Sequence, residues 1–147
     1  MFQRVVAAID WSEPSGRAVE VAKELATLSG GEVRLLHVHE VERLPPHGGG
    51  PLAKTVGAVA TKGEEEAVQH VAAAASKMTD AGVTATCEVR VSLPGRVAAE
   101  IVEESTAWKA DAIVMGSRGL TDLAGILLGS TTHKVLHLTS IPVVVVR

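Results

Sequence analysis

The chain has little cysteine and few aromatic residues. It contains one cysteine, Cys87, no tyrosine, one phenylalanine and two tryptophans among 147 residues. A single cysteine cannot form an internal disulfide, which is typical of a protein in the reducing cytoplasm. On the apolar side of its predicted strand, Cys87 is expected to be an inert core thiol. So few aromatic rings disfavour a flavin site built on aromatic stacking.

Long apolar runs and an excess of charge of one sign are also missing. The longest apolar stretches are shorter than the ~20 residues that a membrane helix needs, and the N-terminus lacks the long apolar region of a secretory signal. The formal net charge is −3, and the basic residues are scattered among acidic ones. No basic field is therefore available to hold nucleic acid. We expect neither a membrane nor a nucleic acid as a partner.

Several well-known chemical signatures are absent as well. The sequence has no Gly-x-x-x-x-Gly-Lys-Ser/Thr loop, and no Gly-x-Gly-x-x-Gly follows its first strand, which disfavours P-loop enzymes and dinucleotide-binding domains. It shows no paired carboxylates and no nucleophile with a base at a recognised spacing. His37 and His39 are too few for zinc, and His133 and His137 do not form a recognised metal motif with Cys87. We expect no catalytic residue and no resident metal.

Short apolar runs alternate with segments of helical spacing. Residues 4–10, 33–38, 112–115 and 143–146 predict buried parallel strands. Between them, apolar residues recur at helical spacing in residues 18–26, 67–78 and 97–101. This order predicts a Rossmann-like α/β fold, with residues 1–147 in a single domain and helices on both faces of an open parallel five-stranded sheet.

One further strand differs in its pattern. Apolar residues at the odd positions 83–91 alternate with polar residues at the even positions 84–90. Such alternation gives one apolar and one polar face. It predicts a half-exposed strand at an edge of the sheet.

Local signals predict the helix ends. Ser12 is a candidate N-cap for the first helix, with Pro14 in its first turn. Gly82 is expected to end the second helix and Pro94 to begin the third. Acidic residues 64–66 are expected to form the first turn of the second helix, where the helix dipole favours negative charge.

A proline- and glycine-rich stretch at residues 45–51 predicts a mobile loop within a flexible region of about residues 42–57. It follows the second strand and so leaves the sheet at the carboxyl end of that strand. The loop is either a lid over a ligand or a surface insertion without a role.

A glycine-rich run after an apolar strand is the most informative motif. It comprises Gly116, Ser117, Arg118 and Gly119, then nine residues, then Gly129, Ser130 and Thr131. Glycines tolerate φ > 0 and let backbone N–H groups approach an anion closely. The hydroxyls and the free N–H groups of the helix that follows would donate to phosphate oxygens, and Arg118 and Lys134 would add positive charge. The alternative is an ordinary strand-to-helix connection with Ser130 as an N-cap.

The glycine spacing resembles the ATP-binding signature of the universal stress protein family (UspA-like), Gly-x-x-Gly followed by nine residues and Gly-Ser. The likeness extends to residues 4–12 (RVVAAIDWS), 35–39 (LLHVH), 114–119 (VMGSRG) and 141–146 (IPVVVV). Ala8 and Trp11 lie at positions that vary in the family, and the proline- and glycine-rich insert is a departure from its pattern.

The resemblance implies strand order 3-2-1-4-5, with a site beyond the carboxyl ends of the first and fourth strands. It implies ATP as the ligand, with Mg²⁺ held mainly by the phosphates and water. Ala8 and Val38 would border the adenine, Met115 would pack beside it, and Asp10 would lie at the ribose or the phosphates. From its residue type alone, Asp10 is a turn or helix-cap carboxylate.

Three functions remain open. The resemblance implies an ATP-binding regulator in the stress response, which acts through partner or dimer surfaces and an unidentified protein partner. A slow ATPase or nucleotidyl-transfer enzyme is the second alternative, and weak ATP hydrolysis is compatible with either. A flavin-binding electron-transfer module is the third, since a fold alone does not determine function.

The last strand predicts self-association. It follows Pro142 and runs to Val146 as four consecutive valines. A bare apolar strand at the edge of a sheet is an aggregation hazard. The simplest cover is the same strand of a second copy, so we expect a homodimer through residues 142–146.

Overall fold

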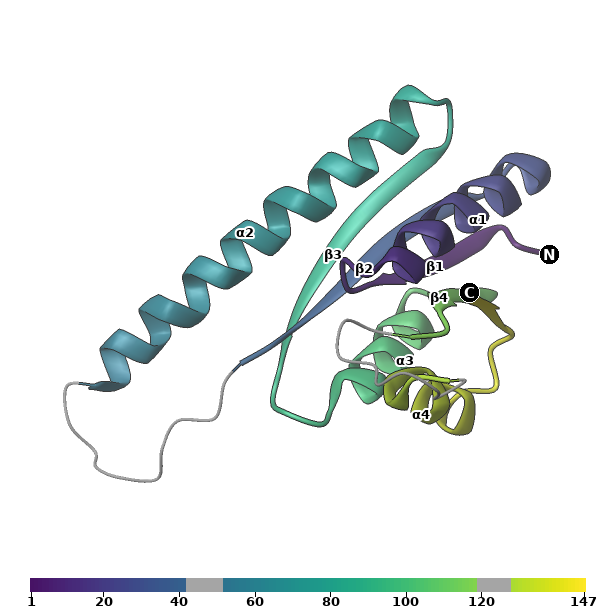
Figure 1. Ribbon diagram of the computed structural model, residues 1–147. Helices are drawn as coiled ribbons and strands as arrows, with labels where there is room; N and C mark the ends of the chain where they lie inside the picture. The colour runs from purple at the N-terminus through teal and green to yellow at the C-terminus, as the bar shows by residue number, and fades with distance from the viewer. Residues whose placement is uncertain (42–51, 119–127) are drawn as a thin grey trace.

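Five parallel strands form one sheet in the order β3-β2-β1-β4-β5 in the computed structural model (Figure 1). The structure describes residues 1–41, 52–118 and 128–147. The strands are β1 (Arg4–Ile9), β2 (Glu32–Glu40), β3 (Thr84–Ser92), β4 (Ala112–Gly116) and β5 (Val143–Val146). The predicted strand order is confirmed, and β3 and β5 lie at the two edges.

Two helices cover each face of this sheet. The helices are α1 (Glu13–Ser29), α2 (Leu52–Asp80), α3 (Val97–Ala107) and α4 (Ser130–Leu138). Helices α1 and α2 pack on one face, with α2 lying along β2 and β3, and α3 and α4 pack on the other (Figure 1). The predicted arrangement of helices on both faces is confirmed.

Capping residues determine both ends of α1. Ser12 is the N-cap, and its Oγ accepts a 3.3 Å hydrogen bond from the N–H of Ser15. Pro14 lies in the first turn of the helix. Proline is tolerated there because the N–H groups of the first turn have no acceptor within the helix. The helix ends at Gly30, whose φ of +65° is the left-handed conformation that glycine adopts readily. These features were predicted for the start of the helix.

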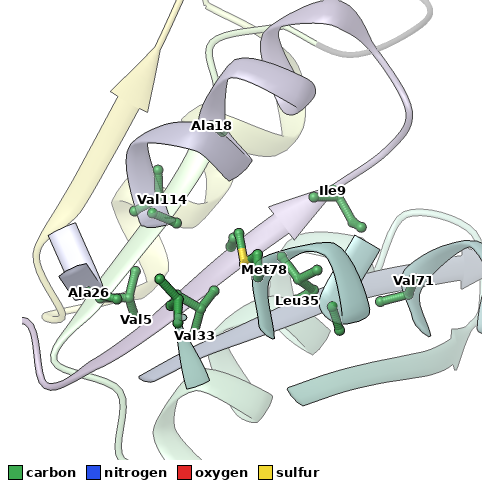
Figure 2. Close-up of a cluster of buried hydrophobic side chains, with 13 residues drawn as sticks. Val5, Ile9, Ala18, Ala26, Val33, Leu35, Val71, Met78 and Val114 are labelled. Carbon is green, nitrogen blue, oxygen red and sulfur yellow. The ribbon is translucent and has the colours of Figure 1, made fainter. Parts of the chain in front are cut away.

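The alternation of side chains along β1 divides the core into two clusters. Val5 and Ala7 face α1 and α2, whereas Val6 and Ala8 face α3 and α4. Figure 2 shows the first cluster, in which valines and a leucine of the sheet meet α1 and α2. Helix α1 presents Ala18, Ala22 and Ala26, a small residue every four positions, so its backbone lies close to β1 and β4.

The second helix begins earlier than predicted. It starts at Leu52 and ends at Asp80, with Gly82 (φ +85°) just beyond. Residues 64–66 therefore lie inside the helix, and the prediction that they form its first turn was wrong. Of the flexible region predicted at about 42–57, residues 42–51 lie outside the described residues and residues 52–57 have helical backbone. The run after Pro51 contains several alanines and no proline, which favours an early helix start.

Two smaller predictions were also wrong. Helix α3 begins at Val97 rather than at Pro94, because Gly95 adopts a φ of +84° and forms a turn before the helix. Cys87 is exposed, not buried in the core. It lies in the edge strand β3, which has a neighbouring strand on only one side, and the core cluster includes Ala85 and Val89 but not Cys87.

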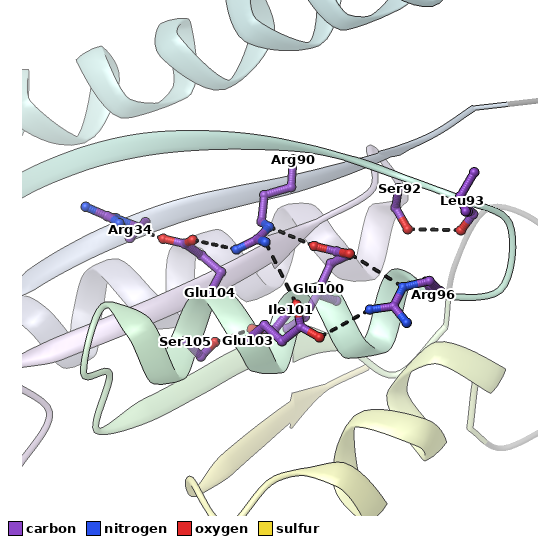
Figure 3. Close-up of polar contacts among 10 residues, drawn as sticks. All are labelled: Arg34, Arg90, Ser92, Leu93, Arg96, Glu100, Ile101, Glu103, Glu104 and Ser105. Atoms are coloured by element: carbon purple, nitrogen blue, oxygen red, sulfur yellow. Dashed lines mark hydrogen bonds and ion pairs between the residues drawn. The ribbon is translucent and has the colours of Figure 1, made fainter.

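On the polar face of β3, Arg90 meets carboxylates of α3 (Figure 3). Arg90 forms ion pairs of 2.8 Å with Glu100 and 3.0 Å with Glu104. Glu104, which is only 8% exposed, also receives a 2.7 Å hydrogen bond from Arg34 of β2. The guanidinium of Arg34 lies 4.7 Å from the ring centre of Trp108. The predicted edge position of β3 is correct. On its polar face, Thr84 and Thr86 are exposed, whereas α3 shields Arg90 through these ion pairs.

None of the described helices combines the length and the apolar character that crossing a membrane requires.

Candidate functional site

A cavity of about 490 Å³ opens where β1, β2 and β4 end. One wall is apolar and belongs to the α3 side of the core; it is formed by Ala8, Leu36, Val38, Val97, Ile101 and Met115. The other wall is polar and is formed by Asp10, Arg118, Ser130 and Thr131, with Gly116 and Gly129. A cavity of this size that combines an apolar wall with a few convergent polar groups is the usual form of a small-molecule site.

Most of the predicted site residues line this cavity. They are Ala8, Asp10, Val38, Met115, Gly116, Arg118, Gly129, Ser130 and Thr131. Ser117 is buried at 3% exposure and is not among the lining residues of the described chain. Gly119 lies outside the described residues. Lys134 is exposed on α4 and is also absent from the described lining.

The polar wall contains the N-terminus of α4. Gly129 is the N-cap, and the first helical hydrogen bond runs from the N–H of His133 to the carbonyl of Gly129 at 2.9 Å. The N–H groups of Ser130, Thr131 and Thr132 precede that bond, so they have no helical acceptor. Together with the helix dipole, such groups favour an anion.

Backbone hydrogen bonds attach this helix end to the sheet. The N–H of Gly129 donates to the carbonyl of Ser117 at 2.6 Å, and the N–H of Ser117 donates to the carbonyl of Val146 at 2.6 Å. Ser117 therefore connects β4, β5 and the start of α4 through its backbone. These bonds use only its backbone and do not require a serine, and a ligand contact of its own stays a prediction.

The two described glycines of the motif do not have the backbone conformation that was expected. Gly129 has φ −66° and ψ 152°, an extended conformation open to any residue, and Gly116 is not among the described glycines with positive φ. At Gly116 the constraint is space, because a Cβ there would lie 2.9 Å from Cβ of Pro14 and 3.0 Å from N of Ser15. Glycine allows the end of β4 to pack closely against the start of α1.

Asp10 takes part in a local turn at the mouth of the cavity. Its Oδ1 accepts hydrogen bonds from the N–H of Ser12 at 3.1 Å and from Oγ of Ser12 at 2.5 Å. This is the turn carboxylate that the residue type alone predicts. Both bonds use Oδ1, and the residue also lines the cavity. The turn therefore holds this carboxylate at a residue that borders the site.

Eight lining residues were not predicted for the site: Ile9, Trp11, Leu36, His37, His39, Glu40, Val97 and Ile101. Two of them, Trp11 and His37, lie against each other. Their ring centres lie 5.1 Å apart, and Trp11 also lies 5.3 Å from the ring of His70 on α2. Trp11 has φ +66°, a conformation that costs a non-glycine residue about 1 kcal/mol. Both are sequence neighbours of predicted residues, since Trp11 follows Asp10 and His37 precedes Val38. That adjacency was the only available signal.

His37 is partly buried in this wall. Its Nδ1 lies 2.9 Å from the carbonyl oxygen of Ile9. Burial lowers the pKa of His37 below its ordinary value of 6.5, and the contact with Ile9 only partly opposes that effect. The neutral imidazole is thus favoured beside the cavity.

Strand β2 extends past the end of β1. The last pair between them is Ile9 with His37, whereas β2 continues to pair with β3 as far as Glu40 with Ser92. On its β1 side, the backbone from Val38 onward therefore has no strand partner among the described residues. Val38 and His39 line the cavity at this point.

The comparisons with known proteins agree with the fold. The model of the family described as "Universal stress protein family" matches residues 1–147. The chain belongs to the universal stress protein family.

Among related universal stress proteins, one from Thermus aquaticus is 37% identical over 147 residues, which covers 100% of both chains. The universal stress protein MJ0577 of Methanocaldococcus jannaschii is 30% identical and is covered to 96%. The solved structure of MJ0577 superposes with a TM-score of 0.85 over 99% of this chain and 96% of that one. An Archaeoglobus fulgidus family member, solved in complex with dAMP, has 24% identity and a TM-score of 0.65 over 98% of this chain and 96% of its own.

Proposed function

We propose that this universal stress protein binds ATP in the cavity at the ends of β1, β2 and β4, and that occupancy regulates its interactions in the stress response. The observation that carries the proposal is the pairing of an apolar wall with the N-terminus of α4 in one cavity. The apolar wall would bind an adenine, and the N-terminus of α4 would bind a phosphate chain. The dAMP complex of the Archaeoglobus fulgidus relative supports a nucleotide ligand.

The apolar wall suits the base. Ala8, Val38 and Met115 offer a slot for the adenine. The β1 side of the β2 backbone from Val38 onward, which has no strand partner in the described part of the chain, offers N–H and carbonyl groups to the edge of the base. Hydrogen bonds to the base edge would then come from the backbone rather than from side chains. The ring of Trp11 borders the same space.

The polar wall suits the ribose and phosphates. Asp10 would accept a hydrogen bond from the ribose or lie near the phosphates, and the first turn of α4 would donate to the phosphate oxygens through Ser130 and Thr131. Arg118 would add positive charge. Gly116, Ser117, Gly119 and Gly129 belong to the same proposed loop; the place of Gly119 rests on the sequence motif.

Magnesium would enter with the nucleotide. The carboxylates among the described lining residues are Asp10 and Glu40, and no group of three or more potential ligands for a metal occurs in the part of the chain that the structure describes. Mg²⁺ is commonly held by phosphates and water with one or two carboxylates. The residues present therefore fit an ion that the phosphates carry, and not a dedicated metal centre.

The ligand can be identified directly. Freshly purified protein is denatured, the released small molecules are analysed by chromatography and mass spectrometry, and the emptied protein is titrated with Mg-ATP by calorimetry. We expect released ATP or tight rebinding. If the protein releases no nucleotide and binds none, the glycine motif is structural here and the proposal is wrong.

Variants of the loop test where the phosphates bind. Ser130→Ala should weaken binding by about 1 kcal/mol, or roughly fivefold, if it removes one hydroxyl contact. Ser76→Ala, at an exposed serine of α2, is the matched control and should bind as the parent does. Gly119→Glu should abolish binding while the circular dichroism spectrum is unchanged. Retained affinity in Gly119→Glu would refute the phosphate loop. ATP turnover in the parent far above that of Gly119→Glu would favour the slow ATPase.

A homodimer through β5 is part of the proposal. Strand β5 is a sheet edge, and its valines are all half-buried; Val144 and Val146 pack against one core cluster and Val143 against the other. Their side chains are already packed, so the free edge offers mainly backbone N–H and carbonyl groups to a second copy. Light scattering over a hundredfold dilution tests this expectation. A monomer mass at every concentration would refute it.

A further inference from the structure

Two histidines on α4 converge outside the cavity. His133 and His137 are both exposed, and their Nε2 atoms lie 3.3 Å apart. Their ring centres are 4.5 Å apart with an interplanar angle of 64°. Residues four apart share one face of a helix, so the backbone of α4 holds both rings on the same side. We propose that His133 and His137 form a bidentate site for a divalent transition-metal ion of the zinc and copper class.

The distance between the two nitrogens suits a shared metal. An ion about 2.05 Å from each Nε2 would subtend an angle of about 107° at their 3.3 Å separation, close to the tetrahedral angle that zinc prefers. Copper(II) prefers an angle near 90°, which needs the nitrogens at about 2.9 Å and only a small rotation of the side chains. Both ligand atoms are thus nearly in place before the ion arrives.

A direct hydrogen bond explains this arrangement less well. The usual range for a nitrogen donor is about 2.7–3.2 Å, and the two Nε2 atoms are slightly farther apart than that. A neutral hydrogen bond between exposed groups also stabilises little, because water competes for both partners. The sequence from His133 to His137 has the H-x-x-x-H spacing that places two zinc ligands on one helix face in other proteins.

The site is open rather than closed. The described residues include no group of three or more potential ligands, so water or a small anion would fill the other coordination positions. Lys134 lies beside the pair and adds positive charge, which weakens binding of a cation. We therefore expect an exchangeable ion, held less tightly than in a structural zinc site. The sequence alone predicted no metal, because it considered the pair only together with Cys87.

The site is independent of the nucleotide proposal. It requires only the helical backbone of α4 and two imidazoles, and His133 and His137 do not line the cavity in the described chain. It lies on the same helix, however, and Ser130 is three residues before His133. A metal that bridges two turns would stabilise the helix whose first turn lines the cavity.

The test uses copper(II) iminodiacetate, whose chelator fills three positions and leaves others for imidazole. Titration is followed by calorimetry, and the bound copper by electron paramagnetic resonance. We expect one site with two imidazole nitrogens in the parent protein. His133→Ala and His137→Ala should each lower the affinity at least tenfold. His70→Ala, a histidine of α2 away from this site, should leave it unchanged. Equal affinity in parent and His137→Ala, or loss of the site in His70→Ala, would overturn the proposal.

A second variant separates geometry from the number of histidines. The double change His137→Ala and Leu138→His keeps two imidazoles but moves one to the position five residues after His133, on another face of the helix. We expect it to bind no better than His137→Ala. Zinc chloride should raise the melting temperature of the parent and not that of the double variant. Full affinity in the double variant would show that helix geometry does not create the site.

Discussion

Thr132 donates a 2.8 Å hydrogen bond from its Oγ1 to the backbone carbonyl of Gly116. The bond joins the first turn of α4 to the carboxyl end of β4, and both groups are buried. Gly116 lines the cavity, and so does Ser130, which lies two residues before Thr132 in the first turn of α4. Together with the backbone hydrogen bond from Gly129 to Ser117, a side chain that does not itself line the site thus holds together the two segments that carry the glycine motif.

Replacing this hydroxyl should lower stability. Thr132→Val keeps the shape of the side chain but leaves the carbonyl of Gly116 buried without its partner. We expect a loss of about 1–2 kcal/mol in the free energy of unfolding, measured in urea, and weaker binding of Mg-ATP. Thr132→Ser retains the hydroxyl and is the control. Unchanged stability in Thr132→Val would show that the bond does not hold α4 in place.

Gly116 should not tolerate a methyl group. In Gly116→Ala the new Cβ would meet Cβ of Pro14 at 2.9 Å and N of Ser15 at 3.0 Å. Backbone atoms at a helix start cannot move aside easily, so we expect a destabilisation of about 1–3 kcal/mol. Gly16→Ala is a matched control, since a Cβ there meets nothing within 4 Å. It should stabilise α1 by up to about 1 kcal/mol. A melting temperature for Gly116→Ala equal to that of the parent would contradict the close packing.

Glu104 should contribute more to stability than the exposed acid beside it. Its side chain is 11% exposed and pairs with both Arg34 and Arg90, whereas the side chain of Glu103 is 53% exposed. Glu104→Ala leaves two partly buried guanidinium groups without their shared carboxylate. We expect a loss of about 2–3 kcal/mol, reduced from the cost of a fully buried pair because both arginines reach solvent. Glu103→Ala should cost less than about 1 kcal/mol. Equal losses in urea unfolding would refute this ranking.

The sequence predicted the sheet well because its signals are local and repeat within each strand. Buried strands such as β1 carry a continuous apolar run, and the alternation in residues 83–91 placed β3 at an edge. The strand order came from the family resemblance and not from periodicity. The predicted start of α2 was wrong because the flexible region predicted around the proline- and glycine-rich insert was extended to about residue 57, although the residues after Pro51 favour a helix.

The sequence predicted many residues of the candidate site, but not the contacts that determine its structure. Sequence spacing led to nine of the lining residues, yet it misjudged why Gly116 is a glycine, because a close approach to Pro14 across the fold leaves no local signal. Trp11 and His37 were missed for the same reason. Their contact joins the loop after β1 to β2, and only the folded chain brings them together.

Acid should destabilise the protein partly through His37. Because burial lowers the pKa of His37 in the folded state, the unfolded state binds more protons between that lowered pKa and 6.5. Its contribution to stability is therefore complete above pH 6.5 and decreases as the pH falls through this window. In His37→Gln we expect a shallower decrease of the unfolding free energy over the same range. The check is urea unfolding of the parent and of His37→Gln at several pH values. Parallel pH profiles for the parent and His37→Gln would contradict this role.

Trp11 should report occupancy of the cavity. The protein has two tryptophans; Trp11 is 45% exposed and lines the cavity, whereas Trp108 packs against the guanidinium of Arg34 on the α3 side of the sheet. A ligand in the cavity would change the surroundings of the first ring and not of the second. We expect Mg-ATP to alter the tryptophan emission of the parent and of Trp108→Phe with the same midpoint, and to leave the emission of Trp11→Phe unchanged. A signal that persists in Trp11→Phe and disappears in Trp108→Phe would place the ligand elsewhere on the molecule, even if calorimetry still shows binding.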